Sequence, residues 1–348
     1  QIMNIDKTIV PNPLYEHILS YGPGTKERIA LKNRIKELKS QKIEIPLIIG
    51  GKEVKTGNLA EIRVPHDHQH LLGHYHLAGE KEVNMAIDSA MEAWESWSRM
   101  PWESRAAIFK KMASILQRPN DQTLNAATML GQSKNAFQAE IDASCEMIDF
   151  LNFNCWYAQE LYSQQPTYSP DGIWNRLEHR PLEGFVFAAT PFNFTSIAGN
   201  LPAAPALMGN VCIWKPASSA VYSSYFMMKL FLEAGVPEGV INFIPGSGKD
   251  IGPTIMKNQN LAGVHFTGST GVFQGMWKTI GENINNYKSY PRIVGETGGK
   301  DFCIAHESSN ICLLYTSDAA DEGLGVALGG RRIFKKKGGG GGGGGGGG

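Results

Sequence analysis

Short apolar runs alternate with longer amphipathic runs between residues 184 and 300. The apolar runs are residues 185–189, 211–214, 240–244, 264–267 and 292–295. The runs between them have about the length of crossover helices, and strands that alternate with helices through short links form a parallel sheet covered on both faces. The pattern predicts an α/β fold with a Rossmann-like parallel sheet flanked by helices. Such sheets bind ligands at the carboxyl ends of their strands.

The N-terminal half predicts further helices and one hairpin. Apolar positions at helical spacing indicate helices over residues 25–39, 80–97, 102–117 and 135–162. Residues 43–49 and 52–54 are predicted to be two strands joined by a tight turn at Gly50-Gly51. Pro166, Pro170 and Pro181 then interrupt the helical pattern, and residues 163–182 are predicted to form an extended hairpin beside the core.

The predicted helix 135–162 carries large apolar residues at helical spacing. We expect this stripe to pack inward as core rather than to form a cofactor site. Its members are Phe137, Ile141, Ile148, Leu151 and Trp156. Glu140 lies on the same helix, and we expect it to be an exposed acid, with a substrate contact as the alternative.

Composition excludes some classes of partner. The chain has 33 basic and 33 acidic residues and no net charge, which argues against nucleic acid or an anionic membrane as its main partner. Its apolar runs are far shorter than the roughly 20 residues needed to cross a bilayer. The cysteines at positions 145, 155, 212, 303 and 312 show no paired spacing, and we expect reduced, mostly buried thiols in an intracellular protein.

The composition changes sharply after residue 310. Residues 313–337 show neither helical nor strand periodicity, and residues 338–348 are all glycine. Polyglycine cannot bury apolar area to offset its chain entropy. We expect residues 311–348 to be a non-native tail, with a genuine flexible tail as the alternative. Because the first residue is Gln1, we also expect the natural start to be missing.

Histidines are concentrated between residues 66 and 76. They stand at positions 66, 68, 70, 74 and 76, and imidazole is a common zinc ligand. Strand alternation would place His66, His68 and His70 on one face. Nothing in the sequence marks a further ligand or a supporting shell, so we expect an exposed hairpin and no metal site.

Polar residues follow the predicted strands at the edge where ligands bind. Asn193 follows the first strand, Lys215 the second and Glu296 the last. An amide can donate to an oxygen that gains negative charge, a lysine can donate to ribose hydroxyls, and a carboxylate can accept a proton from water or a thiol. The alternatives are a turn asparagine, a lysine that extends into solvent and a strand-end acid.

Glycine-rich stretches follow the third and fourth strands. Residues 246–252 are similar to a dinucleotide fingerprint, although the third glycine comes one residue late. Gly268-Ser269-Thr270-Gly271 precedes a predicted helix, whose free N–H groups and dipole suit a pyrophosphate. Taken alone, Ser269 or Thr270 fits an N-cap better. Within the ordered set of strand-end residues, the phosphate interpretation is preferred.

Four motifs occur together in one order. They are Pro191-Phe192-Asn193, Trp214-Lys215-Pro216, Phe266-Thr267-Gly268-Ser269-Thr270 and Gly295-Glu296-Thr297-Gly298-Gly299-Lys300. This set resembles the aldehyde dehydrogenase superfamily, and the resemblance extends to about Asn310. Residues 138–143 and 182–195 are most similar to its delta-1-pyrroline-5-carboxylate dehydrogenase branch, which oxidises L-glutamate gamma-semialdehyde to L-glutamate in proline catabolism.

The resemblance implies roles for the strand-end residues. Asn193 would be the oxyanion donor, Glu296 the general base, and Phe194 would pack on the aliphatic part of the aldehyde substrate. NAD is the implied cofactor, with contacts from Thr190, Lys215, Gly268, Ser269, Thr270, Gly271 and Val272. Ser218 stands where many family members have an acid that prefers a free 2′-hydroxyl, so NADP stays open.

The resemblance also implies an organisation for the whole chain. We expect an N-terminal helical part of the cofactor-binding domain at 1–162, a hairpin of oligomerisation type at 163–182, an NAD-binding core at 183–300, the start of a largely missing catalytic domain at 301–310, and the non-native tail. The full-length parent is expected to be a homodimer or higher homo-oligomer. The mitochondrial matrix is its expected location, although the chain shows no targeting segment.

The chemistry of this superfamily requires a thiolate that attacks the aldehyde. The position that matches the family's cysteine is Gly330, inside the expected non-native tail, and no Gly-Gln-x-Cys occurs in the chain. Cys303 lies in an apolar run and is predicted to be a core thiol, and Cys312 lies in doubtful sequence. We therefore expect a dehydrogenase fragment without activity. The alternatives are a non-catalytic NAD-binding module and a dehydrogenase for a different aldehyde.

Overall fold

The computed structural model describes residues 10–118, 121–298 and 306–308. The α-helices of this part are α1 Lys26–Ser40, α2 Glu80–Trp97, α3 Trp102–Leu116, α4 Thr123–Gln132, α5 Ala136–Ala139, α6 Glu146–Ser163, α7 Thr195–Leu207, α8 Val221–Ala234, α9 Gly248–Lys257 and α10 Thr270–Glu282. A π-helical turn, Glu140–Cys145, joins α5 to α6. The predicted helices are confirmed within one or two residues at 25–39, 80–97 and 102–117, whereas α4 was not predicted.

The strands form two sheets. They are β1 Ile43–Ile45, β2 Leu47–Ile49, β3 Lys52–Val54, β4 Leu59–Val64, β5 Asp67–His76, β6 Phe185–Ala189, β7 Val211–Lys215, β8 Ile241–Phe243, β9 Leu261–Gly268 and β10 Arg292–Thr297. The larger sheet has the order β10-β9-β6-β7-β8-β2-β3, and the smaller sheet has the order β1-β5-β4.

The larger sheet contains the five strands predicted between residues 184 and 300. β10, β9, β6, β7 and β8 pair in parallel, and β2 and β3 extend the sheet with antiparallel pairs. The doubly covered parallel sheet of the sequence analysis is therefore confirmed. The single strand predicted over 43–49 is wrong, because β1 pairs with β5 and β2 with β8. Pro46 lies between them and cannot donate to a ladder.

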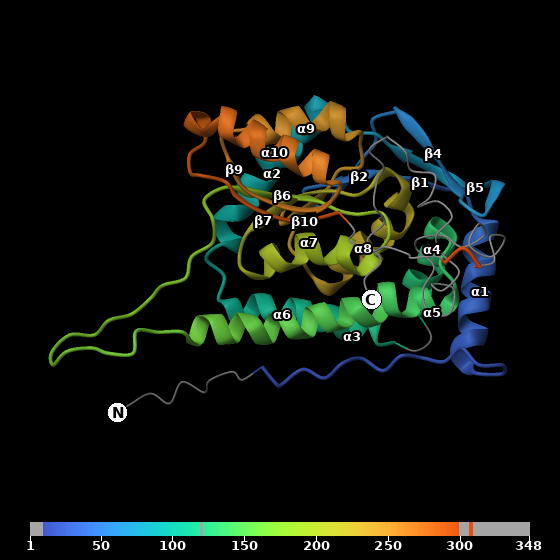
Figure 1. Ribbon diagram of the computed structural model, residues 1–348, viewed down its shortest axis with the longest axis horizontal. Helices are drawn as coiled ribbons and strands as arrows, with labels where there is room; N and C mark the ends of the chain where they lie inside the picture. Colours follow the sequence, from blue (N-terminus) through green and yellow to red (C-terminus); the bar gives the residue numbers. More distant parts are fainter. Residues whose placement is uncertain (1–9, 119–120, 299–305, 309–348) are drawn as a thin grey trace.

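Helices cover both faces of this sheet (Figure 1). α2, α9 and α10 lie on one face, α7 and α8 lie on the other, and α3 and α6 form a further layer beyond α7 and α8. β6 and β7 are buried along almost their whole length, as expected for strands between two helical layers. The helical layers cover the two faces of the sheet and leave the carboxyl ends of its parallel strands uncovered.

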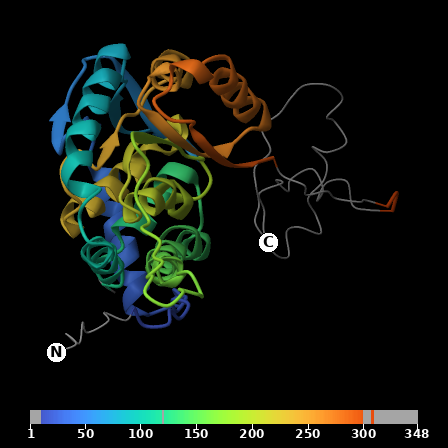
Figure 2. The same cartoon turned by 90° about the vertical axis from the view of Figure 1, so that its left-hand side faces the viewer.

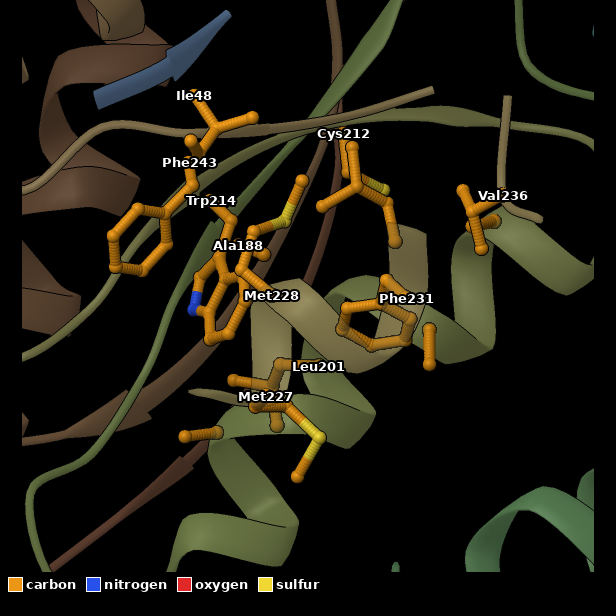
Figure 3. Close-up of a cluster of buried hydrophobic side chains, with 14 of the residues drawn as sticks. Ile48, Ala188, Leu201, Cys212, Trp214, Met227, Met228, Phe231, Val236 and Phe243 are labelled. Atoms are coloured by element: carbon orange, nitrogen blue, oxygen red, sulfur yellow. The ribbon is translucent and has the colours of Figure 1, made fainter. Parts of the chain in front are cut away.

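The core is centred on β7 (Figure 3). The Trp214 side chain is fully buried, and its ring meets those of Phe231 and Phe243 edge to face at centroid distances of 6.0 and 5.1 Å. Such aromatic contacts stabilise a core by about 0.5–1.5 kcal/mol beyond the buried area. They fix β7 against α8 and β8 and thus hold the end of β7 in place.

Two expectations for the long helix 135–162 are wrong. Phe137 is 55% exposed rather than inward, and Glu140 is only 3% exposed rather than solvated. The π turn explains the change of face, because an extra residue in one helical turn shifts the phase of the side chains. Glu140 accepts hydrogen bonds from the backbone N–H of Leu19 and the hydroxyl of Tyr21 at 3.1 and 2.5 Å. The N-terminal segment therefore covers it.

Residues 164–184 leave the body of the molecule as a long excursion, at the left of Figure 1 and toward the viewer in Figure 2. Hydrogen bonds between Gln165 and Leu177 connect its two arms, although neither arm forms a regular strand. Tyr168 and Trp174 are 73% and 79% exposed. Nowhere in the described part of the chain is a helix apolar and long enough to span a membrane.

Candidate active-site cleft

A cleft of about 1600 Å³ opens at the carboxyl ends of β6, β7, β9 and β10, between α9 and α10. It is lined by eight of the residues singled out from the sequence: Thr190, Asn193, Phe194, Lys215, Gly268, Ser269, Val272 and Glu296. Thr270 and Gly271 lie in the first turn of α10 but do not line it. The amide, the amine, the helix start and the carboxylate thus meet around one cleft.

The link after β6 is fixed before it reaches Asn193. The Thr190 hydroxyl accepts a hydrogen bond from the Trp214 indole N–H at 3.1 Å, and the Thr190 N–H donates to the Lys215 carbonyl at 3.2 Å. At the far end of the link, the buried Thr195 hydroxyl lies 2.8 Å from the Thr128 hydroxyl. The half-buried Asn193 is therefore held between two anchored residues.

Phe194 lies over an ion pair that the sequence analysis missed. The Lys134 ammonium is 4.7 Å from the centroid of the Phe194 ring and 2.5 Å from the Asp142 carboxylate. The Asp142 side chain is 3% exposed, and a buried charge of this kind needs a partner. The sequence does not mark this pair, because Asp142 lies in the π turn, which helical periodicity does not reveal.

Lys215 ends β7 with its side chain packed beside the first turn of α9. Its Nζ donates to the Pro216 carbonyl at 3.0 Å. A methyl group at Gly248 would lie 3.7 Å from its Cε. Burial lowers the pKa of the Lys215 ammonium, because removal from water disfavours the charged form.

Ser269 is the N-cap of α10, which is one of the two roles predicted for it from the sequence. Its hydroxyl accepts from the N–H of Val272 at 3.4 Å. The first N–H groups of an α-helix have no partner within the helix. Capping by Ser269 and binding of an anion at the start of α10 are therefore compatible. The structure thus places a helix start on the cleft and leaves the phosphate role a prediction.

Glu296 is exposed on β10, the edge strand of the sheet. Gly295 beside it packs against α10, since a Cβ there would come within 2.3 Å of the Phe273 ring. Gly298 has a φ of +71°, which favours glycine. The backbone thus turns directly after the carboxylate. Gly299 and Lys300 of the same motif lie outside the described residues.

Glu146 is a second carboxylate on the cleft that the sequence analysis did not find. It enters from α6 and accepts a hydrogen bond from the Ser196 hydroxyl at 2.6 Å. Burial raises its pKa. The available signal was an acid on a helix whose neighbours Met147 and Ile148 are buried, but this pattern does not say which cavity the acid faces.

Glycines on the two helices that face the cleft leave an open slot between α9 and α10. Gly252 of α9 and Gly275 of α10 both line it, and a Cβ at either position would meet no atom within 4 Å. Open space beside two glycines can accommodate a planar ring, and the adjacent helix start and lysine suit phosphate and ribose groups. The residues present therefore fit a dinucleotide.

The family model described as "Aldehyde dehydrogenase family" matches residues 53–327. The chain belongs to the aldehyde dehydrogenase family. A "Delta-1-pyrroline-5-carboxylate dehydrogenase" from Agaricus bisporus is 50% identical over 303 residues, which are 87% of this chain and 55% of that protein. A mitochondrial protein of the same name from Dictyostelium discoideum is 47% identical over 304 residues, 87% of this chain and 54% of that protein.

Solved structures agree with these sequence relatives. The delta-pyrroline-5-carboxylate dehydrogenase of Mycobacterium tuberculosis, bound with NAD, has a TM-score of 0.83 and 46% identity, covering 89% of this chain and 58% of that chain. A 1-pyrroline-5-carboxylate dehydrogenase from Thermus with bound NAD has a TM-score of 0.77 and 28% identity, covering 84% and 56%. This aldehyde dehydrogenase family chain spans about half the length of the curated relatives it matches.

None of the cysteines in the described part of the chain lines the cleft. Cys145, Cys155 and Cys212 are buried, and burial raises the pKa of all three, that of Cys155 to about 12. Such thiols are poor nucleophiles. Cys303, Cys312 and Gly330, together with the predicted tail 311–348, lie outside the described residues.

The histidines between 66 and 76 lie on and beside β5 in a hairpin with β4. His66 is exposed and 2.8 Å from the Ser133 hydroxyl, whereas His76 is buried and accepts from the N–H groups of Thr56 and Gly57. Over residues 10–118, 121–298 and 306–308, no three or more of His, Cys, Asp and Glu are grouped closely enough to hold a metal.

Proposed function

We propose that this chain is the cofactor-binding part of an NAD-dependent dehydrogenase that oxidises L-glutamate gamma-semialdehyde, in equilibrium with pyrroline-5-carboxylate, to L-glutamate. The observation that carries the proposal is the convergence of Asn193, Lys215, Ser269 and Glu296 on one cleft. The names of the relatives and the NAD bound to two solved structures support the substrate and the cofactor.

Each strand-end residue has a distinct task in this proposal. Lys215 and the start of α10 hold the ribose and the pyrophosphate, and bound NAD supplies a hydride acceptor. The Asn193 amide donates to the carbonyl oxygen as it gains charge; one such donor is worth about 3 kcal/mol. Glu296 accepts a proton from a thiol or from the hydrolytic water. Phe194 packs against the aliphatic part of the substrate.

Binding of NAD is tested directly by calorimetric titration of the purified chain. We expect saturable binding, and we expect Gly275→Leu to abolish it by filling the slot between α9 and α10. Gly281→Leu is the matched control, because Gly281 lies on the same helix, also has open space around it and does not line the cleft. Equal loss of NAD binding in both variants, or no NAD binding by the unsubstituted chain, would overturn the proposal.

Turnover tests whether the chain itself can oxidise an aldehyde. Because Gly330 stands where the family has its nucleophile and the described thiols are buried, we propose that the chain binds NAD without oxidising an aldehyde. NADH formation with pyrroline-5-carboxylate would contradict this. Sequencing of the messenger RNA beyond the codon for Asn310 tests whether the full-length parent is a dehydrogenase. An in-frame Gly-Gln-x-Cys there would support a complete enzyme.

The same relatives and one exposed segment support a proposal on the location and assembly of the full-length parent. We propose a mitochondrial matrix protein, supported by the Dictyostelium relative, whose name includes "mitochondrial". The exposed apolar residues of the 164–184 excursion support subunit contact and a homodimer or larger homo-oligomer. Sedimentation of the chain with and without this segment tests the second point: unchanged mass would count against it.

A further inference from the structure

β10, Arg292–Thr297, is the outermost strand of the larger sheet and has one unpaired side. It pairs in parallel with β9 without a break in register, and in the described part of the chain its backbone forms hydrogen bonds with no other segment. Exposed edge strands are commonly protected by a lysine, a proline or a bulge. β10 contains none of these. Its outer N–H and C=O groups can therefore pair with a further strand.

One face of β10 is exposed as well. Gly295 faces α10, because a Cβ there would lie 2.3 Å from the Phe273 ring. Since side chains alternate between the two faces of a strand, Arg292, Val294 and Glu296 share the opposite face. All three are exposed, Val294 at 61%. An apolar β-branched residue thus stands between two charges of opposite sign on the edge of the sheet.

This face is complementary to itself. In an antiparallel pair of two β10 strands centred on Val294, position 292 of one copy lies opposite position 296 of the other. Each Arg292 guanidinium then meets a Glu296 carboxylate, and the two Val294 side chains meet at the centre. Both are favourable cross-strand pairs. A parallel pair in register would instead place arginine opposite arginine.

The two charged groups are available for such a pair. Among the described residues neither Arg292 nor Glu296 is in a salt bridge. Arg292 donates from one guanidinium nitrogen to the Tyr290 carbonyl at 2.8 Å, which leaves its other N–H groups for a carboxylate.

We propose that two copies of this chain associate by antiparallel pairing of their β10 strands, with a two-fold axis between the two Val294 residues. The larger sheets of the two copies then form one continuous sheet. Because Glu296 lines the cleft, Arg292 of the second copy stands at the margin of that cleft. The inference goes beyond the proposed function and uses a surface distinct from the 164–184 excursion.

Sedimentation velocity of the purified chain over a range of concentrations tests the inference. We expect a reversible dimer, and slower hydrogen exchange of the β10 amides as the dimer forms. Val294→Lys places two ammonium groups opposite each other and should raise the dimer dissociation constant at least about tenfold. Arg292→Glu should do the same. Arg292→Glu combined with Glu296→Arg should restore the dimer, because the exchange keeps opposite charges across the axis.

Ile29→Lys is the matched control for the added charge. Ile29 lies on α1 and is 54% exposed, and we expect its substitution to leave dimerisation unchanged. A chain that stays monomeric up to about 100 µM would overturn the inference. So would equal weakening by Ile29→Lys and Val294→Lys, or a charge exchange that fails to restore the dimer. Loss of the dimer in Trp174→Ser but not in Val294→Lys would also overturn it, since Trp174 lies on the excursion. These results leave the test of NAD binding unaffected.

Discussion

The indole N–H of Trp214 donates to the hydroxyl of Thr190 across 3.1 Å. Trp214 is fully buried in β7, and Thr190 is the first residue after β6, on the floor of the cleft. The bond therefore joins the densest part of the core to the link that carries Asn193. Packing and the position of the site depend on each other here, because a rigid core holds the strand ends from which the polar groups project.

The first prediction isolates this bond with a double-mutant cycle. Trp214→Phe leaves a cavity and an unpaired hydroxyl, and it should cost about 2–4 kcal/mol of unfolding free energy. Thr190→Val should cost about 1 kcal/mol. Urea denaturation of both variants and of the double variant should give a coupling near 1 kcal/mol. Strictly additive losses would mean that the two residues act independently.

The second prediction concerns the buried carboxylate of Glu140. The Tyr21 hydroxyl lies 2.5 Å from it, and the Asn125 amide donates to the same oxygen at 2.7 Å. Tyr21→Phe removes one donor to a charged group, so we expect a loss of about 1.5–3 kcal/mol in urea denaturation and faster proteolysis of the N-terminal segment. Tyr290→Phe, at a residue 75% exposed, is the control and should change neither. Equal behaviour of the two variants would refute the role given to Tyr21.

The cleft could be predicted largely from the sequence because its parts are local. Asn193, Lys215 and Glu296 each follow a strand that reads as a short apolar run, and parallel strands end at one edge. Lys134 and Glu146 could not be found in this way. Glu146 reaches the cleft from α6, and Lys134 lies beside Phe194 on the link before α5. Both positions depend on packing between helical layers, which leaves no periodic mark in the sequence.

The errors in the fold have a similar cause. Residues 43–49 form an unbroken extended pattern, but Pro46 divides it between two sheets. The burial of Glu140 depends on a distant segment around Tyr21, together with a π turn that helical periodicity cannot reveal. Strands buried on both faces were easy to predict, because each of them is a continuous apolar run in the sequence.

The third prediction separates binding from stability at Lys215. Burial lowers its pKa, so the folded chain binds this proton less readily than the unfolded chain. The penalty is absent above the ordinary lysine pKa, and it develops as pH falls toward the lowered value. Lys215→Met should therefore melt at the same or a higher temperature at pH 7, yet bind NAD at least about tenfold more weakly. Calorimetry measures both; lower stability together with unchanged binding would contradict the assignment.

The fourth prediction uses the opposite shift at Glu146. Burial raises its pKa, so the folded chain binds this proton more readily than the unfolded chain. Stability is fully retained below the ordinary glutamate pKa and is lost as pH rises from there through the raised value. Glu146→Gln removes the charge, and the glutamine oxygen can still accept from Ser196.

The melting temperatures of the unsubstituted chain and of Glu146→Gln should therefore coincide near pH 4 and diverge by pH 7, with Glu146→Gln the more stable. Glu92→Gln, at an exposed position on α2, is the matched control and should show no such divergence. A Glu146→Gln variant that is less stable at pH 7 would indicate that the carboxylate is stabilised by partners rather than strained by burial.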